Sequence, residues 1–261
     1  MSVINGYQAP APRELVEDFG PEPYDINFCF PIDFSRLESE RVKLVPFLPR
    51  LHAQIYLDQV LQHPELETWL PFNYTRLAHV LHLVEVNFRQ NSASVAFAVI
   101  DKGRPDPEHP EWGGSMAGVT GLIKASPENL SVEIGWVITF PAFQRTYVTS
   151  SANALLLRYC LATPDEQNPG LGLRRVQWFA NAKNVPSVNT ALRLGFKMEG
   201  KLRWERIIPA KYSSVAANGA PIRPGDPKPE TLSRDSSLLS CCADDWANGG
   251  RELVQRILDR K

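Results

Sequence analysis

Residues 132–160, VEIGWVITFPAFQRTYVTSSANALLLRYC, decide how the chain is interpreted. The first part has the pattern of a largely buried strand, FPAF marks a turn, and the remainder has the apolar spacing of a helix. Strand–loop–helix units often hold a phosphate, because the free N–H groups and the dipole of the helix N-terminus attract anions. Such loops are usually rich in glycine, whereas QRTYVTS contains none. By themselves these residues leave two alternatives: a phosphate site without glycine, or a loop that only caps a helix.

The composition is that of a globular protein, with 43% hydrophobic and 22% charged residues in a chain of 261. A formal net charge of -1 provides no basic surface for nucleic acid or anionic lipid. No apolar run approaches the roughly 20 residues of a membrane-spanning helix. The N-terminal stretch MSVINGYQAPAPREL lacks the basic and apolar regions of a secretory signal. We therefore expect a cytoplasmic protein with neither a nucleic-acid nor a membrane partner.

The four cysteines, Cys29, Cys160, Cys241 and Cys242, have neither metal-site spacing nor the count of a disulfide scaffold. We expect buried thiols in a reducing compartment, and no metal.

The patterns along the chain predict one domain of class α/β (or α+β), a mixed sheet with helices on both faces. Residues 1–34 are rich in proline and acidic residues and predict an arm that lies over or trails from the domain at 35–261. Residues 209–232 are crowded with Pro, Gly and Ser and predict a long loop or insertion. Strand patterns lie near residues 42–47, 94–101, 116–125, 131–138, 173–181, 197–208 and 236–243. Helical patterns lie near residues 51–61, 78–89, 148–162, 184–196 and 251–260.

Two motifs, QRT and the later N-x-x-S…A-x-R-L-G-F-x-x-E-G, resemble the GNAT superfamily of acyl-CoA N-acyltransferases, in particular its ribosomal-protein-acetyltransferase-like branch. The resemblance extends, in the family's order, from about Arg36 to the C-terminus. The stretches that carry it are LESERVKLVPF, WLPF, VEIGWVITFPAFQRT, RRVQW, NAKNVPSVNTALRLGFKMEGKLR and RDSSLLSCCADDW. It implies a mixed central sheet splayed between its fourth and fifth strands, here VEIGWVIT and RRVQWFA, with acetyl-CoA in the wedge.

The resemblance also implies a set of cofactor-binding residues. Unpaired backbone groups of Val137, Ile138 and Thr139 would bond the pantetheine arm, because splaying leaves them without ladder partners. Asn184 would bond the pantetheine amide, and Ser187 would lie near the sulfur. The pyrophosphate would sit on Gln144, Arg145, Thr146, Tyr147, Val148, Thr149 and Ser150. Tyr147 and Thr149 stand where the superfamily has glycines. Arg145 and the hydroxyls of Thr146 and Thr149 would replace close backbone approach. The resemblance thus favours the phosphate site.

Acetyl transfer from a thioester to an amine requires a base, a polarised carbonyl and a proton for the departing thiolate. Ser187 is the candidate proton donor, because the position at which many family members have a tyrosine is Ala191; bound water is the alternative. Glu133 is the candidate base, since burial on a strand raises a carboxyl pKa. The other possibilities are a structural carboxylate bonded to an arginine such as Arg41, a role for Glu85, and bound water.

The acceptor groove is expected to be lined by the aromatic segment that holds Trp69, Phe72 and Asn73. Trp136, Trp204 and Glu85 complete the expected set. An apolar groove fits a small-molecule amine or a peptide N-terminus with an apolar neighbour; plain core packing of these aromatics is the alternative.

Several positions depart from the branch and bear on the acceptor and the acid–base residues. Ser151 and Asn181 replace acidic residues, Phe179 replaces a basic one, and the last hairpin carries the 209–232 insertion, either a substrate lid or a tolerated extension. The sequence therefore predicts an N-acetyltransferase that moves the acetyl group directly to a primary amine in a ternary complex. The insertion and the arm favour a small molecule over a protein N-terminus. The alternatives are a catalytically silent CoA-binding domain and a same-fold acyltransferase with another donor. No sequence feature indicates an oligomeric state.

Overall fold

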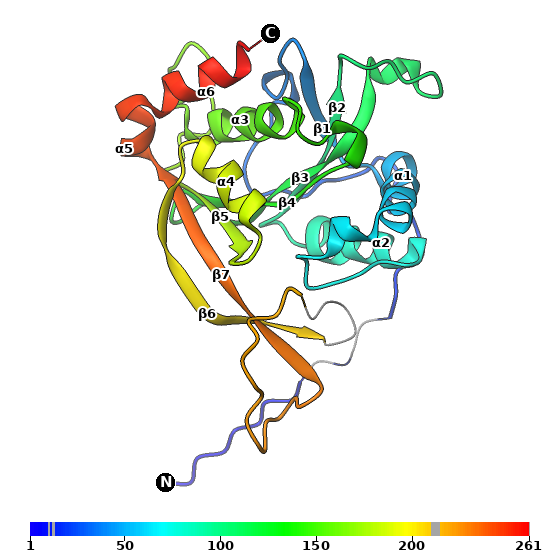
Figure 1. Cartoon of the computed structure of the whole chain (residues 1–261), viewed down its shortest axis with the longest axis vertical. Helices are drawn as coiled ribbons and strands as arrows, with labels where there is room; N and C mark the ends of the chain where they lie inside the picture. Colours follow the sequence, from blue (N-terminus) through cyan, green and yellow to red (C-terminus); the bar gives the residue numbers. More distant parts are fainter. Residues whose placement is uncertain (10, 12–13, 210–214, 261) are drawn as a thin grey trace.

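The structure, a computed structural model, describes residues 1–9, 11, 14–209 and 215–260. One seven-stranded mixed sheet with the order β1-β2-β3-β4-β5-β7-β6 forms its centre (Figure 1). The strands are β1 (Val42–Pro46), β2 (Val95–Asp101), β3 (Ser115–Ser126), β4 (Ser131–Thr139), β5 (Arg175–Asn181), β6 (Lys197–Pro209) and β7 (Thr231–Cys242). The α-helices are α1 (Pro49–Gln62), α2 (Leu77–Val84), α3 (Val148–Leu161), α4 (Val185–Arg193), α5 (Ala243–Asp245) and α6 (Arg251–Leu258). The predicted α/β class is confirmed.

The sheet opens between β4 and β5, as predicted. These parallel strands pair only where Ser131, Val132 and Glu133 face Arg175, Val176 and Gln177. Beyond this point β4 stays paired with β3 as far as Thr139, and β5 stays paired with β7 as far as Asn181. The edge of β4 that faces β5 after Glu133 therefore has backbone groups without a ladder partner.

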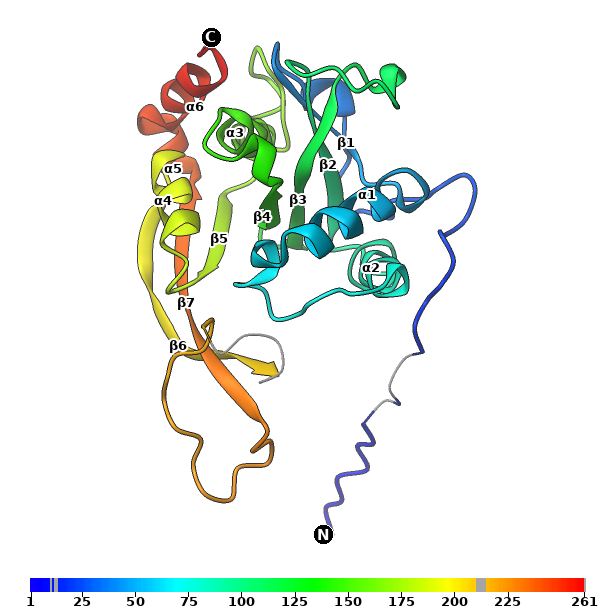
Figure 2. The same cartoon turned by 45° about the vertical axis from the view of Figure 1, so that its right-hand side comes forward.

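Helices cover both faces of the sheet. Figure 2 shows α1 and α2 on one side of the central strands and α3 on the other, where α3 packs against α6. Because both faces are covered, a central strand such as β2 is buried along its whole length. α3 is buried on almost all sides rather than along a single stripe, because sheet and α6 enclose it. The helix expected near residues 78–89 ends as an α-helix at Val84 and continues as a π-helical turn, Glu85–Arg89.

The N-terminal arm is attached to the domain by backbone hydrogen bonds along its second half. The N–H of Cys29 donates to the carbonyl of Ser92 at 2.8 Å, and the N–H of Asp33 donates to the Tyr159 hydroxyl at 2.8 Å. Residues 1–9 extend away from the domain (Figure 1). Residues 10, 12 and 13, which the sequence assigns to the arm, lie outside the described residues.

All four cysteines are free thiols. Cys160 and Cys241 are buried as expected, Cys242 is half-buried, and the expectation of burial is wrong for Cys29, because it lies in the surface arm. In the part of the chain that the structure describes, no helix has the length and apolar character needed to cross a bilayer.

The predicted insertion is partly strand, because β6 runs to Pro209 and β7 begins at Thr231. Between them, residues 210–214 lie outside the described residues. Ala216 and Ala217 are buried, so the loop folds back onto the domain instead of extending freely at this point.

Candidate active site

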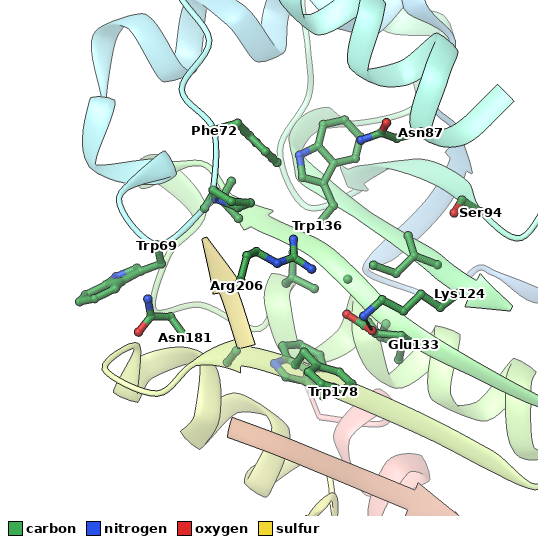
Figure 3. A pocket seen from close by; sticks show the side chains of 18 of the residues that line it. Trp69, Phe72, Asn87, Ser94, Lys124, Glu133, Trp136, Trp178, Asn181 and Arg206 are labelled. Carbon is green, nitrogen blue, oxygen red and sulfur yellow. Dashed lines mark ion pairs between the residues drawn. The ribbon is translucent and has the colours of Figure 1, made fainter. Parts of the chain in front are cut away.

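A cavity of about 520 Å³ lies where β4 and β5 separate (Figure 3). β3, β4 and β5 form one wall, and the loop at residues 69–72, the π-helical turn after α2 and the ends of β6 and β7 form the others. The residues predicted for catalysis, cofactor binding or acceptor binding that line this cavity are Trp69, Phe72, Glu133, Trp136, Val137, Asn184 and Ser187. Tertiary structure thus brings together predicted residues from three separate segments of the chain: the loop at residues 69–72, β4 and the start of α4.

Three residues expected in the acceptor groove lie outside the cavity lining: Asn73, Glu85 and Trp204. Glu85 forms an ion pair with Arg89 and accepts a hydrogen bond from Gln90 Nε2, and these bonds hold the pKa of its carboxyl below the usual range. Trp204 lies in a bulge of β6 with φ of +55°, and its side chain is half-exposed.

Trp136 is packed beneath the aromatic wall of the cavity. Its ring centroid lies 5.2–5.4 Å from those of Phe47, Tyr56 and Phe88. The backbone of Trp136 has φ of +51°, within an irregular stretch of the β3–β4 pairing. Such a left-handed residue bends a strand and re-aims its side chain.

The aromatic loop is held in place by a buried carboxylate. Glu67 accepts hydrogen bonds from the Tyr56 hydroxyl at 3.0 Å and from the N–H of Tyr74 at 2.7 Å, and burial raises the pKa of its carboxyl. Phe72 stacks on Tyr74 with ring centroids 4.6 Å apart. Arg234 Nη1 donates to the carbonyl of Trp69 at 3.0 Å, which ties the loop to β7. The loop is therefore fixed from both sides of the cavity.

Glu133 is the buried acid of the cavity, with 4% of the residue exposed. Its Oε2 lies 2.8 Å from Nζ of Lys124 on the neighbouring strand, and Lys124 Nζ also lies 4.4 Å from the centroid of the Phe179 ring. Burial raises the pKa of the Glu133 carboxyl, and Lys124 opposes that shift. Arg41 is not its partner: the Arg41 guanidinium stacks on the Tyr147 ring and donates to the carbonyl of Arg260.

Ser187 is oriented by a buried indole on the opposite side of the wedge. Trp178 Nε1 donates to Ser187 Oγ at 3.0 Å. Because an indole N–H is only a donor, Ser187 Oγ is the acceptor and its own O–H is left to donate elsewhere. Asn184 caps α4, since its Oδ1 accepts from the N–H of Ser187 at 3.2 Å. Ala191 is fully buried and provides no hydroxyl.

The loop before α3 has backbone donors, but its hydroxyls are largely engaged. The Thr146 hydroxyl donates to the carbonyl of Phe143 at 2.6 Å, and the Ser150 hydroxyl donates to the carbonyl of Tyr147 at 2.9 Å. The Thr139 and Thr149 hydroxyls bond each other at 2.6 Å. Thr146 therefore has no O–H left for a phosphate, in contrast to the sequence-based expectation.

The residues at the two glycine positions, Tyr147 and Thr149, do not obstruct the loop. The Tyr147 side chain points away from it: its hydroxyl donates to Asp101, and the Arg41 guanidinium stacks on its ring. Arg145 is exposed and has φ of +59°, a conformation that glycine adopts freely. The first-turn N–H groups of Thr149 and Ser150 have no intrahelical partner. Backbone donors and one arginine are thus what this loop offers an anion.

The hydrogen bonds of Asn181 explain why the chain has an amide at a position where the branch that it resembles has an acid. It is buried, its Nδ2 donates to the carbonyl of Ala216 at 2.7 Å, and its Oδ1 accepts from the N–H of Lys183 at 2.9 Å. An ionised carboxylate can only accept, so it could not bond the Ala216 carbonyl. The amide is therefore matched to the insertion, because it supplies the donor that the Ala216 carbonyl accepts.

The cavity residues that sequence reasoning missed include Lys124, Trp178, Glu205, Arg206 and Arg234. Four of these are charged residues on strands, and the face of the sheet on which their side chains lie depends on the register of strand pairing. Trp178 was assigned to a buried face, but nothing in its spacing indicates a bond to Ser187.

We predict that Asn181→Asp lowers the free energy of unfolding by about 1–3 kcal/mol at pH 7, because a carboxylate oxygen then replaces the Nδ2 donor opposite the Ala216 carbonyl and two acceptors face each other. The loss should shrink at acidic pH, where a protonated carboxyl donates again. Urea denaturation at both pH values measures this. The exposed Asn168→Asp is the matched control, and equal stability of the two variants at pH 7 would contradict the assignment.

Comparisons with known proteins agree with this geometry. A family model described as an acetyltransferase (GNAT) domain matches residues 41–197. No curated protein matches the chain significantly. Among solved structures, a GCN5-related N-acetyltransferase from Brucella melitensis superposes with a TM-score of 0.63 at 23% identity, covering 85% of this chain and 84% of that one.

Two further structures are more distant. RimJ from Mycobacterium smegmatis, in complex with CoA-disulfide, has a TM-score of 0.56 at 15% identity and covers 82% of this chain and 88% of its own. A chimera of the spermidine N-acetyltransferase SpeG from Vibrio cholerae and hSSAT has a TM-score of 0.52 at 15% identity, covering 79% and 98%. At such identities the structural likeness establishes the shared fold.

Proposed function

The chain belongs to the GNAT acetyltransferase family, and from this premise we propose that it transfers an acetyl group from acetyl-CoA directly to a primary amine within a ternary complex. The observation that carries the proposal is the opening of β4 from β5 onto one cavity, which Glu133 and Ser187 both line. We assign the chain to the ribosomal-protein-acetyltransferase-like branch on its QRT and N-x-x-S motifs. Four free cysteines support a location in the reducing cytoplasm.

The residues around the wedge fit acetyl-CoA, which supplies an acetyl group activated as a thioester. The free edge of β4 offers backbone groups of Val137 and Ile138 to the pantetheine arm, whereas the carbonyl of Thr139 already accepts a hydrogen bond from Gln144 Nε2 at 3.0 Å. The N-terminus of α3 and the exposed Arg145 offer donors to the pyrophosphate. Asn184 uses its oxygen to cap α4 and keeps its NH₂ for the pantetheine.

Proton transfer is assigned to residues of the two separated strands and of α4. Glu133 accepts the proton that the amine loses; its raised pKa brings the carboxyl nearer to the neutral range where a base is effective. Ser187 donates its O–H to the departing sulfur, with its orientation set by Trp178. The aromatic wall formed by Trp69, Phe72 and Trp136 limits water around these groups.

The acceptor is a small-molecule amine in this proposal. The cavity is closed on one side by the anchored aromatic loop, and Asn181, which lines the cavity, is bonded to the insertion. Spermidine, named in the function of one structural relative, is an amine of this size. A catalytically silent CoA-binding domain would share the CoA site, so turnover separates the two functions.

We predict that Arg145→Ala weakens CoA binding by about tenfold or more, the effect of losing one charge-assisted hydrogen bond. Isothermal titration calorimetry with CoA measures the Kd. Arg174→Ala, an exposed arginine before β5, is the control and should bind as the wild type does. Equal Kd values in all three proteins would show that this loop does not hold the phosphates.

Ser187→Ala should lower kcat by about tenfold to a hundredfold while Kd for CoA changes little, because the hydroxyl acts on the departing sulfur. Ser187→Thr, which keeps a hydroxyl, should retain more activity. Steady-state kinetics of both variants measures this. Wild-type kcat in Ser187→Ala would indicate that water, rather than Ser187, donates the proton to the departing sulfur.

The acid limb of the pH profile of kcat should follow the ionisation of the Glu133 carboxyl. Glu133 is active when ionised, so activity falls as the pH drops through its raised pKa. Lys124→Met removes the cation that opposes the shift, so the limb should move to higher pH. Glu133→Gln should lose kcat by roughly a hundredfold. An unmoved limb in Lys124→Met would assign the titration to another group.

A further inference from the structure

Two arginines face each other across the last hairpin, at the edge of the cavity. Arg206 on β6 is the register partner of Arg234 on β7, and both line the cavity. In Figure 3 the Arg206 side chain points into the cavity, toward the space between Trp136 and the Lys124–Glu133 pair. Like charges directly opposite each other in a sheet are destabilising. Such a pair at a cavity calls for an anion that the folded chain does not itself provide.

Arg234 is a buried cation without a carboxylate partner among the described residues. It is 7% exposed and lies within ion-pair distance of no described acid. Its three hydrogen bonds reach neutral acceptors, the Trp69 carbonyl and the Ser236 hydroxyl, the latter twice. A guanidinium has five N–H donors, so two remain. Burial, together with the charge of Arg206, lowers its pKa, and the more distant charges of Glu205 and Glu133 oppose that shift.

Arg206 similarly lacks a carboxylate within hydrogen-bond distance among the described residues. Within the described chain its one ion pair is with its sequence neighbour Glu205, at 3.8 Å, beyond the range of a hydrogen bond. Glu205 uses its other oxygen to accept from the Ser236 hydroxyl at 2.9 Å. The Arg206 fork is therefore available for a planar anion, which is the geometry that guanidinium groups bind in two-point fashion.

The charges that line the cavity set the charge of the anion. Three cations, Lys124, Arg206 and Arg234, face two carboxylates, Glu133 and Glu205, which leaves one net positive charge. A carboxylate neutralises it, whereas a phosphate dianion would overcompensate. The phosphates of CoA are assigned to the loop before α3, in a different part of the chain from β6 and β7.

We propose that Arg206, assisted by Arg234, binds the carboxylate of the acceptor, so that the acceptor is an amino acid or a close analogue with an apolar side chain. This inference rests on the proposed function. The aromatic residues Trp69, Phe72 and Trp136 take the apolar side chain, and Glu133 receives the amine. Arg206 lies close enough to Glu133 for its charge to act on that carboxyl, which places the two binding groups of the acceptor near each other.

The decisive experiment measures binding without turnover. The full-length protein saturated with CoA is titrated by calorimetry with N-acetyl-L-phenylalanine and with N-acetyl-L-phenylalaninamide, which differ only in the carboxylate. We expect the acid to bind at least tenfold more tightly, and Arg206→Met to abolish this preference. Arg203→Met, on an exposed residue of the same strand outside the cavity, should retain it. Equal binding of acid and amide, binding of neither, or a preference that survives Arg206→Met would overturn the proposal.

Turnover and CoA binding separate this inference from the proposed function. With acetyl-CoA, L-phenylalanine should have a higher kcat/KM than L-phenylalaninamide or phenethylamine. Faster acetylation of these two amines, which lack a carboxylate, would contradict the carboxylate site but not the acetyltransferase activity, whereas absent CoA binding would contradict the acetyltransferase activity itself. Inorganic phosphate should compete with N-acetyl-L-phenylalanine less well than acetate does; the reverse order would assign the arginines to a phosphorylated ligand.

Arg206→Met should also unfold at a higher temperature than the wild type, since it removes the cross-strand repulsion.

Discussion

The loss of pairing between β4 and β5 after Glu133 is the constraint on which the remaining structure depends. Each strand keeps its other neighbour, so the sheet stays intact while its centre opens. Backbone groups freed in this way must find other partners, and a ligand with amide groups can satisfy them. The cavity at this opening is lined by a carboxylate on β4 and, across the gap, by a serine on α4. One departure from regular pairing thus creates both a binding edge and a cavity.

Local departures from strand geometry aim the side chains into that cavity. Lys124 and Trp136 are strand residues with positive φ, a conformation that is unfavourable for residues other than glycine. At Lys124 the ammonium meets Glu133, and at Trp136 the ring is placed beneath the aromatic wall. Strained residues of this kind often gather at functional sites, where surrounding packing compensates for them. Here their clustering around one cavity is consistent with that pattern.

The insertion is bonded to the site through the side-chain amide of Asn181. Asn181 ends β5, lines the cavity and bonds Ala216 of the insertion. In the sequence, the amide at this position is only a departure from the acid of the branch. In the structure, its NH₂ group is the donor for a carbonyl of the inserted segment. The chain thus carries a change at the site and the added segment that explains it.

The sequence by itself determined the class of the fold, the order of its elements and the position of the opening in the sheet. Buried strands and helices have patterns set by local periodicity, and the motifs at QRT and N-x-x-S mark the two sides of the wedge. Only the tertiary structure decided which polar side chains share the cavity. Three residues of β6 stand against one of β7 between the pairs Leu202–Ser236 and Arg206–Arg234, so strict alternation fails there. Trp204, expected in the groove, lies outside the cavity, and Arg206, not expected there, lines it. A shift in register reverses the facing of a strand, and register is set by the partner strand rather than by the residues themselves.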